Sequence, residues 1–220
     1  MTDSARKPHI LAISLAHQFY FDDMFEPLIT AIKSKAKFTQ VKNANSALQQ
    51  LSQQPSPTAV LITDEALTLG QYKHVWSAVL QYIRSGGKAV IMGTFTGHVK
   101  PPNMKPFFAQ ADLPWECGSY HRTTVVLNSA VVEKGLAAKL PAQYSQKAVA
   151  VKNVAPNDAW YMANDDSVIE SMVFAPTSAK AFGESPVTFA SVGDGKLGYI
   201  GDVNAEQGSN AVTLAMCGLL

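Results

Sequence analysis

The chain has 220 residues, 47% of them hydrophobic, and its 18 basic and 17 acidic residues give a formal net charge of +1. This length is typical of a single α/β domain, and the hydrophobic share is that of a chain with a substantial core. The balanced charge argues against nucleic acid and membrane surfaces as partners, because both attract a basic excess.

The beginning of the sequence lacks the pattern of a targeting signal. Residues 1–8 are polar and only a short apolar run follows, whereas a signal peptide needs a longer apolar stretch and a small-residue cleavage site. No segment approaches the roughly 20 apolar residues of a membrane-spanning helix. The two cysteines, Cys117 and Cys217, give neither a disulfide framework nor a metal-binding spacing. We therefore expect a cytoplasmic protein that needs no metal and no cofactor.

Strands and helices alternate in the first half of the sequence. Helical spacing follows Asp23, which forms a capping-box pattern with Glu26, and Asn45 opens a second helix. The clearest amphipathic stripe runs from Tyr72 to Ile83. This order predicts a parallel sheet with right-handed crossovers. Its strands are expected at 10–13, 38–41, 59–62 and 89–92, and the first of these is a continuous apolar run of the kind typical of a parallel strand covered on both faces.

The second half of the sequence has shorter elements. Two segments at its end read as a β-hairpin around Asp194 and Gly195, and an apolar helix at 211–219 is expected to pack against the sheet. No repeat or linker interrupts the chain, so we expect one domain over residues 1–220. Strands are expected at 123–127, 148–151, 187–192 and 196–203.

A glycine-framed turn follows the fourth predicted strand, and its sequence is Gly93-Thr94-Phe95-Thr96-Gly97. Such a turn lifts a nucleophile above the end of a buried strand in many α/β enzymes. A serine or cysteine is expected at its middle position, but this chain has Phe95 there. Ligands of open parallel sheets bind beyond the carboxyl ends of the strands. That rule selects segments 14–23, 63–65, 93–98 and 202–206.

The order of elements, the glycine-framed turn and the late hairpin resemble the class I glutamine amidotransferase-like fold. The likeness runs from Ile10 to Leu219, and segment 113–124 also resembles ThuA-like proteins. The resemblance implies an α/β, flavodoxin-like three-layer sandwich with a mostly parallel central sheet and a C-terminal β-hairpin.

The resemblance also implies where a catalytic apparatus would lie. Active members carry Gly-x-Cys-x-Gly at the turn and His-x-Glu after a late strand, which provide nucleophile, base and orienting carboxylate. In this chain Phe95 stands at the cysteine position, Asn204 at the histidine position and Glu206 at the glutamate position. Asp64 and Glu65 stand where the family has glycines for an oxyanion hole, and carboxylates oppose a developing negative charge. Glutamine hydrolysis by the family mechanism is therefore not expected.

The remaining polar groups at the strand ends are candidates for a site. Glu206 is the best single catalytic candidate, although the dipole of the final helix explains a glutamate there equally well. Phe95 is either a stacking platform for a ligand or a plug that fills the vacated position. The other candidate binding residues are Gly93, Thr94, Thr96, Gly97, His17, His98, Asp64 and Asp202, and loop histidines also serve commonly as surface or capping groups.

One further pair could supply replacement chemistry. Cys117 and His121 would form a thiol–imidazole pair if their segment were helical, but Pro114 and Gly118 disfavour a helix. Cys217 lies in the apolar final helix and is expected in the core.

Three functional hypotheses follow. The first is a non-glutaminase binding or scaffold domain for an unidentified small molecule or protein. The second is a hydrolase with relocated residues, acting on a small ester, amide or sugar derivative, with His17, His98, Cys117, Asp202 and Glu206 as its parts. The third is a self-association module, in which the irregular segment 101–114 forms a homodimer contact.

Overall fold

The computed structural model describes residues 7–173 and 175–220. Five strands pair in parallel in the order β2-β1-β3-β4-β9, which is the flavodoxin-like order, and we call this region the parallel half. The strand predictions for the first half of the sequence are confirmed to within a residue or so. The five strands are β1 (His9–Ile13), β2 (Lys37–Val41), β3 (Ala59–Ile62), β4 (Lys88–Ile91) and β9 (Gly195–Ile200).

The sheet continues beyond β9 with antiparallel strands. Over the described residues it has nine strands, and β9 is followed by β8, β7, β5 and β6 in that order. The expectation of a mostly parallel sheet is therefore wrong, because the sheet is mixed. Parallel neighbours need a crossover of a dozen or more residues, whereas a two-residue turn joins β8 to β9. These strands are β5 (Glu116–Leu127), β6 (Gln143–Lys152), β7 (Ala159–Met162) and β8 (Val187–Val192).

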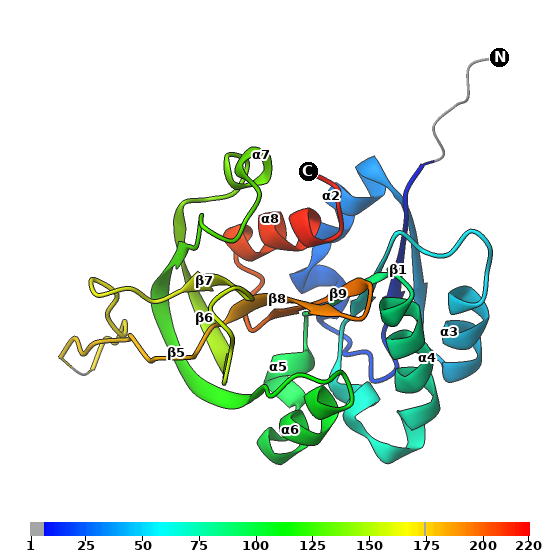
Figure 1. The fold of residues 1–220 in the computed structure, drawn as a ribbon, viewed down its shortest axis with the longest axis horizontal. Helices are drawn as coiled ribbons and strands as arrows, with labels where there is room; N and C mark the ends of the chain where they lie inside the picture. Colours follow the sequence, from blue (N-terminus) through cyan, green and yellow to red (C-terminus); the bar gives the residue numbers. More distant parts are fainter. Residues whose placement is uncertain (1–6, 174) are drawn as a thin grey trace.

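Helices cover both faces of the sheet, so the molecule has three layers (Figure 1). One face carries α1 (Phe21–Met24), α2 (Glu26–Lys35), α8 (Gln207–Met216) and the short α7 (Lys134–Ala137). The other face carries α3 (Ala44–Leu51), α4 (Lys73–Arg84), α5 (Phe95–His98), α6 (Pro101–Ala109) and the 3-10 turns η1 (Glu65–Thr68) and η2 (Gly70–Tyr72).

Alternation along the strands divides the core between these two layers. Leu11 and Ile13 of β1 pack under α3 and α4, while Ile10 and Ala12 pack under α2 and α8. The predicted stripe of α4 is confirmed, because its apolar residues from Val75 to Ile83 are buried against the sheet.

Two helix boundaries differ from those expected. The predicted capping box at Asp23 is wrong, because Asp23 lies inside α1 and α2 begins after Phe25. Phe21 and Phe25 are buried and their rings stack on one another, which fixes this position of the two helices. The last helix runs from Gln207 to Met216 rather than over 211–219, and Gly218 follows it with a φ of 71°. Segment 101–114 contains α6 and is not irregular throughout.

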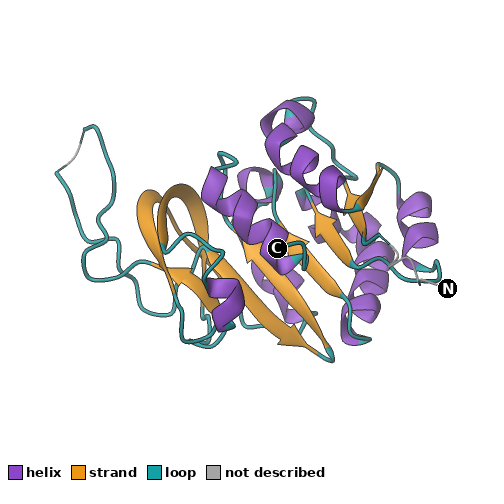
Figure 2. Ribbon diagram, turned by 90° about the horizontal axis from the view of Figure 1, so that it is seen from above, coloured by secondary structure: helices purple, strands orange, loops and turns teal. Residues whose placement is uncertain are grey.

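The antiparallel strands bend back toward the middle of the sheet. The amide of Val149 in β6 donates to Gly201 after β9 at 3.0 Å, and the amide of Val151 donates to Ser185 before β8 at 3.0 Å. In the other direction, the amide of Val203 donates to Lys147 at 2.9 Å. We call β5, β6, β7 and β8 with residues 163–173 and 175–186, the described part of segment 163–186, the curled half (Figure 2).

Candidate functional site

The glycine-framed turn fits closely over the end of the neighbouring strand β3. The amide and hydroxyl of Thr94 both donate to the carbonyl of Thr63, at 2.8 and 3.1 Å. Gly93 has a φ of 73°, and a Cβ there would lie 2.7 Å from the same carbonyl oxygen, so only glycine fits this position.

Phe95, the middle residue of the glycine-framed turn, has no exposed surface. Its ring lies 5.7 Å from that of Phe107 and 6.5 Å from that of Tyr199, measured between centroids. Phe95 begins the short helix α5, and the non-glycine residues with positive φ in the described chain are Asp112, Asn153 and Ala205. The strained backbone of a nucleophile elbow is therefore absent at Phe95, and the buried ring offers no face to a ligand.

Asp64 is buried at the end of β3, and its contacts are all within the chain. One carboxylate oxygen accepts from the amide of Ala16 at 2.9 Å, and the other accepts from the amide of Ala66 at 3.1 Å. Burial raises the pKa of Asp64 to about 6, and these two hydrogen bonds oppose that rise. The backbone donors at this strand end thus bind a carboxylate of the chain itself.

The two candidate histidines contact residues of their own loops and of neighbouring segments. His98 bonds through Nδ1 to the carbonyl of Thr94 at 2.9 Å, and through Nε2 to the hydroxyl of Tyr20 at 3.3 Å. His17 lies 3.4 Å from the Asp22 carboxylate. In residues 7–173 and 175–220, no three histidine, cysteine, aspartate or glutamate side chains are grouped so as to hold a metal ion.

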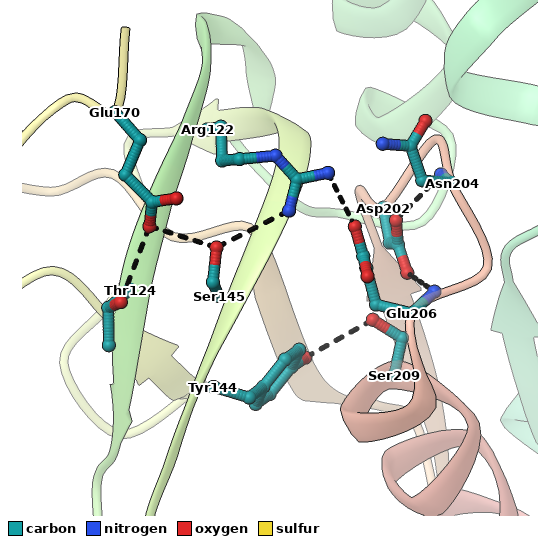
Figure 3. Close-up of polar contacts among 9 residues, drawn as sticks. All are labelled: Arg122, Thr124, Tyr144, Ser145, Glu170, Asp202, Asn204, Glu206 and Ser209. Carbon is teal, nitrogen blue, oxygen red and sulfur yellow. Dashed lines mark hydrogen bonds and ion pairs between the residues drawn. The ribbon is translucent and has the colours of Figure 1, made fainter. Parts of the chain in front are cut away.

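Glu206 forms an ion pair with a residue that the sequence did not single out (Figure 3). Arg122, on β5, donates from Nη2 to Glu206 Oε1 at 2.6 Å and from Nη1 to the Ser145 hydroxyl on β6 at 3.3 Å. With its amide oxygen turned toward the guanidinium, Asn204 accepts from Arg122 Nη2 at 2.7 Å. The structure thus brings Asn204 and Glu206, which follow β9, onto one arginine of the curled half.

Asp202 shapes the loop that presents Asn204 and Glu206. Its carboxylate accepts from the backbone amides of these two residues, at 2.8 and 2.7 Å (Figure 3). Burial raises the pKa of the Asp202 carboxyl. Ala205, which lies between Asn204 and Glu206, has a φ of 55°. The hydroxyl of Thr96 donates to the Asp202 carbonyl at 3.4 Å, which joins this loop to the glycine-framed turn.

A second carboxylate lies on the far side of Arg122. Glu170 accepts from the hydroxyls of Ser145 and Thr124, at 2.9 and 3.4 Å, so Ser145 links it to the guanidinium (Figure 3). Arg122 and Glu206 are 84 positions apart, and nothing in the sequence connects them. The sequence feature that points toward this ion pair is the position of Arg122 in segment 113–124, which resembles ThuA-like proteins.

Cys117 and His121 do not form a pair. Both lie on strand β5, and a β-bulge between Cys117 and Tyr120 shifts the alternation, so the two side chains line different cavities. Burial raises the pKa of the Cys117 thiol, which disfavours the nucleophilic thiolate.

A mainly apolar pocket lies beside the glycine-framed turn, and we call it the elbow pocket. Its volume is about 290 Å³, and Tyr120 stands at it with more than half of its surface exposed. The pocket is lined by Thr96, Gly97, Val99, Met104, Cys117, Tyr120 and Val203.

Neither a family model nor a curated protein sequence matches this chain. Within residues 7–173 and 175–220, every helix is too short or too polar to span a membrane.

Solved structures show where the fold occurs elsewhere. A ThuA-like protein from Bacteroides uniformis matches with a TM-score of 0.59 and 12% identity, over 96% of this chain and 90% of its own. A ThuA-like protein from Parabacteroides merdae matches with a TM-score of 0.55 and 11% identity, over 97% and 89%. A cytoplasmic protein from Salmonella typhimurium matches with a TM-score of 0.52 and 11% identity, over 96% of each chain. This chain therefore shares its α/β fold with ThuA-like proteins, whose class I glutamine amidotransferase-like architecture the sequence resembles.

Proposed function

We propose that this chain is a class I glutamine amidotransferase-like binding domain that lacks glutaminase chemistry and takes a small molecule in the elbow pocket. The observation that carries the proposal is the burial of Phe95, which aligns with the family's cysteine by resemblance and whose ring packs edge-on or tilted against Tyr199 and Phe107 in the core. A phenyl ring has no nucleophilic atom, and an asparagine amide at position 204 cannot act as a general base near neutral pH.

The contacts of the remaining polar groups support the same proposal. Glu206 is paired with Arg122, and Asp64 accepts two backbone hydrogen bonds, so both carboxylates hold parts of the fold together. The elbow pocket is mainly apolar, with Arg122 and Glu206 in the adjacent polar cluster. Such a site suits a compact ligand with an apolar body and a polar end.

The first experiment is a hydrolysis panel of glutamine, small nitrophenyl esters and simple amides. Wild type is compared with Glu206→Ala and Cys117→Ala, and we expect no turnover above background in any of the three proteins. Turnover that falls in either variant would establish the alternative, a hydrolase with relocated residues, and would overturn the binding proposal.

The second experiment tests the pocket directly by ligand-observed NMR with a fragment library. A Cβ at Gly97 would meet no heavy atom within 4 Å, so Gly97→Leu fills the elbow pocket without disturbing the fold. Gly70→Leu is the matched control, because Gly70 is equally open but lies in η2, outside the pocket. We expect hits that bind wild type and Gly70→Leu and fail to bind Gly97→Leu. Hits that bind all three proteins equally would place the ligand elsewhere.

A further inference from the structure

The curled half contains a small cavity, separate from the elbow pocket. It lies between β5, β6 and segment 163–186, and its volume is about 30 Å³. Thr123 on β5 and its cross-strand partner Gln146 on β6 both line it. Because side chains alternate along a strand, these two residues point away from the face that carries Arg122 and Ser145. We call this space the Gln146 cavity.

Gln146 is the unusual residue of this cavity. Its side chain is 1% exposed, and neither the amide nitrogen nor the amide oxygen has a hydrogen-bond partner among the described residues. Buried side-chain amides are nearly always paired, because leaving both ends unpaired forfeits the hydrogen bonds that water provides. An unpaired buried amide that lines a cavity therefore points to an occupant of the cavity.

Neighbouring polar groups do not supply the missing partners. The hydroxyl of Thr123 donates to the Val168 carbonyl at 2.7 Å, and the hydroxyl of Ser119 donates to the Glu184 carboxylate at 2.6 Å. His121 also lines the cavity, and its burial lowers the pKa of the imidazole, which keeps the ring neutral at pH 7. The cavity wall is thus uncharged apart from Glu184, which would repel an anion.

Small side chains keep the space open. Alternate residues of β6 after Gln146 are alanines, and three more alanines of segment 163–186 cover them from the other side. The cavity has room for a few non-hydrogen atoms, on the scale at which a single water needs about 10–15 Å³. The alanines concerned are Ala148, Ala150, Ala163, Ala179 and Ala181.

We propose that the Gln146 cavity binds the carboxamide or urea group of a small uncharged molecule through paired hydrogen bonds to the Gln146 side chain. In this pair the ligand N–H donates to Gln146 Oε1, and Gln146 Nε2 donates to the ligand carbonyl. The planar donor–acceptor edge of the ligand satisfies both ends of the buried amide at once. This site is independent of the elbow pocket and of the function proposed for it.

Titration with small probes, followed by backbone amide NMR shifts of the whole chain, tests the proposal. The probes are acetamide and urea, with acetone as an analogue that accepts but cannot donate and acetate as a charged analogue. We expect saturable shifts at Thr123, Gln146 and Ala148 with acetamide and urea, and binding at least about tenfold weaker for acetone, which loses one hydrogen bond.

Variants then tie the shifts to one side chain. Gln146→Leu removes both polar atoms at nearly constant volume, and Gln143→Leu is its control on the exposed side of the same strand. We expect Gln146→Leu to lose saturable binding and Gln143→Leu to keep it. Ala150→Val, which fills the cavity but leaves the amide intact, should also lose binding, and it covers the case in which Gln146→Leu fails to fold.

Two results would overturn the proposal. One is the absence of saturable shifts with either amide probe in wild type, which would leave water as the occupant. The other is equal binding of acetamide by wild type and a folded Gln146→Leu or Ala150→Val.

Discussion

Two buried polar side chains, Asp64 in the parallel half and Gln146 in the curled half, differ in their hydrogen bonding. Both carboxylate oxygens of Asp64 accept from backbone amides of the chain. The equally buried Gln146 has no partner among the described residues and lines a cavity. Asp64 is thus satisfied by the chain's own backbone, whereas both ends of the Gln146 amide lack such partners.

This difference teaches where to look for a ligand in this fold. Strand ends that carry polar residues are not by themselves a site, because the chain can use those residues to fix its own loops. Buried polar groups without partners are a better guide, since their missing hydrogen bonds must come from another molecule.

The largest expected effect concerns the buried Phe95 in the parallel half. Phe95→Ala should lower the free energy of unfolding by about 3–5 kcal/mol, because it leaves a cavity between Phe107 and Tyr199. Urea unfolding at pH 7 measures this loss, and the 91% exposed Phe19 provides the control Phe19→Ala, with a change of less than about 0.5 kcal/mol. Equal effects of the two variants would show that Phe95 does not seal the core.

The next effect concerns Asp64. Because its pKa is about 6 in the folded state and near 3.8 when unfolded, folding favours the protonated form. The folded state then binds more protons between pH 4 and 6, so the stability that depends on Asp64 is greatest below pH 4 and falls as the pH rises through 6. For a shift of about two units this fall is about 3 kcal/mol.

Asp64→Asn removes this pH dependence, since asparagine does not ionise in this range. The difference in unfolding free energy between wild type and Asp64→Asn should therefore change by about 3 kcal/mol between pH 4 and pH 7, with wild type losing relative stability. Urea unfolding at both pH values measures it, with the exposed Asp23→Asn as control. Parallel pH profiles for wild type and Asp64→Asn would contradict the assignment.

The smallest effect concerns the contact between the two halves. Arg122→Met should cost about 1 kcal/mol, because the pair with Glu206 is only partly screened, with side chains 32% and 26% exposed. A double-mutant cycle with Glu206→Gln isolates the pairwise energy. Lys180→Met breaks the more exposed pair with Asp165 and should change stability by less than about 0.5 kcal/mol. A cycle energy near zero would mean that Arg122 does not hold the halves together.

The sequence predicted the parallel half well. The three short apolar runs of β1, β3 and β4 and the stripe of α4 are local signals, and burial on both faces leaves these strands little ambiguity. The pairing of β8 with β9 was equally accessible, because a two-residue turn joins them.

The curled half was predicted only in part, because residues 187–192 form β8 as expected, 123–127 and 148–151 lie inside longer strands, and β7 was not predicted. Strand β5 begins at Glu116 rather than at residue 123, and most of its residues are partly buried on both faces, which removes the alternation that marks a strand. The partners of Arg122 and the isolation of Gln146 depend on segments far apart in the chain. The resemblance to the family motif singled out Asn204 and Glu206, but their common contact with Arg122 required the fold.

The position of β9 has a consequence for how this molecule assembles. In the sequence β9 follows every other described strand, yet in the sheet it lies between β4 and β8 and so joins the two halves. The strands from β1 to β4 can pair as they are synthesised, but β4 keeps an open edge until β9 arrives. Contacts between segments distant in sequence form slowly, and an unpaired edge invites other chains. The nascent protein thus passes through a stage at which its central edge needs protection.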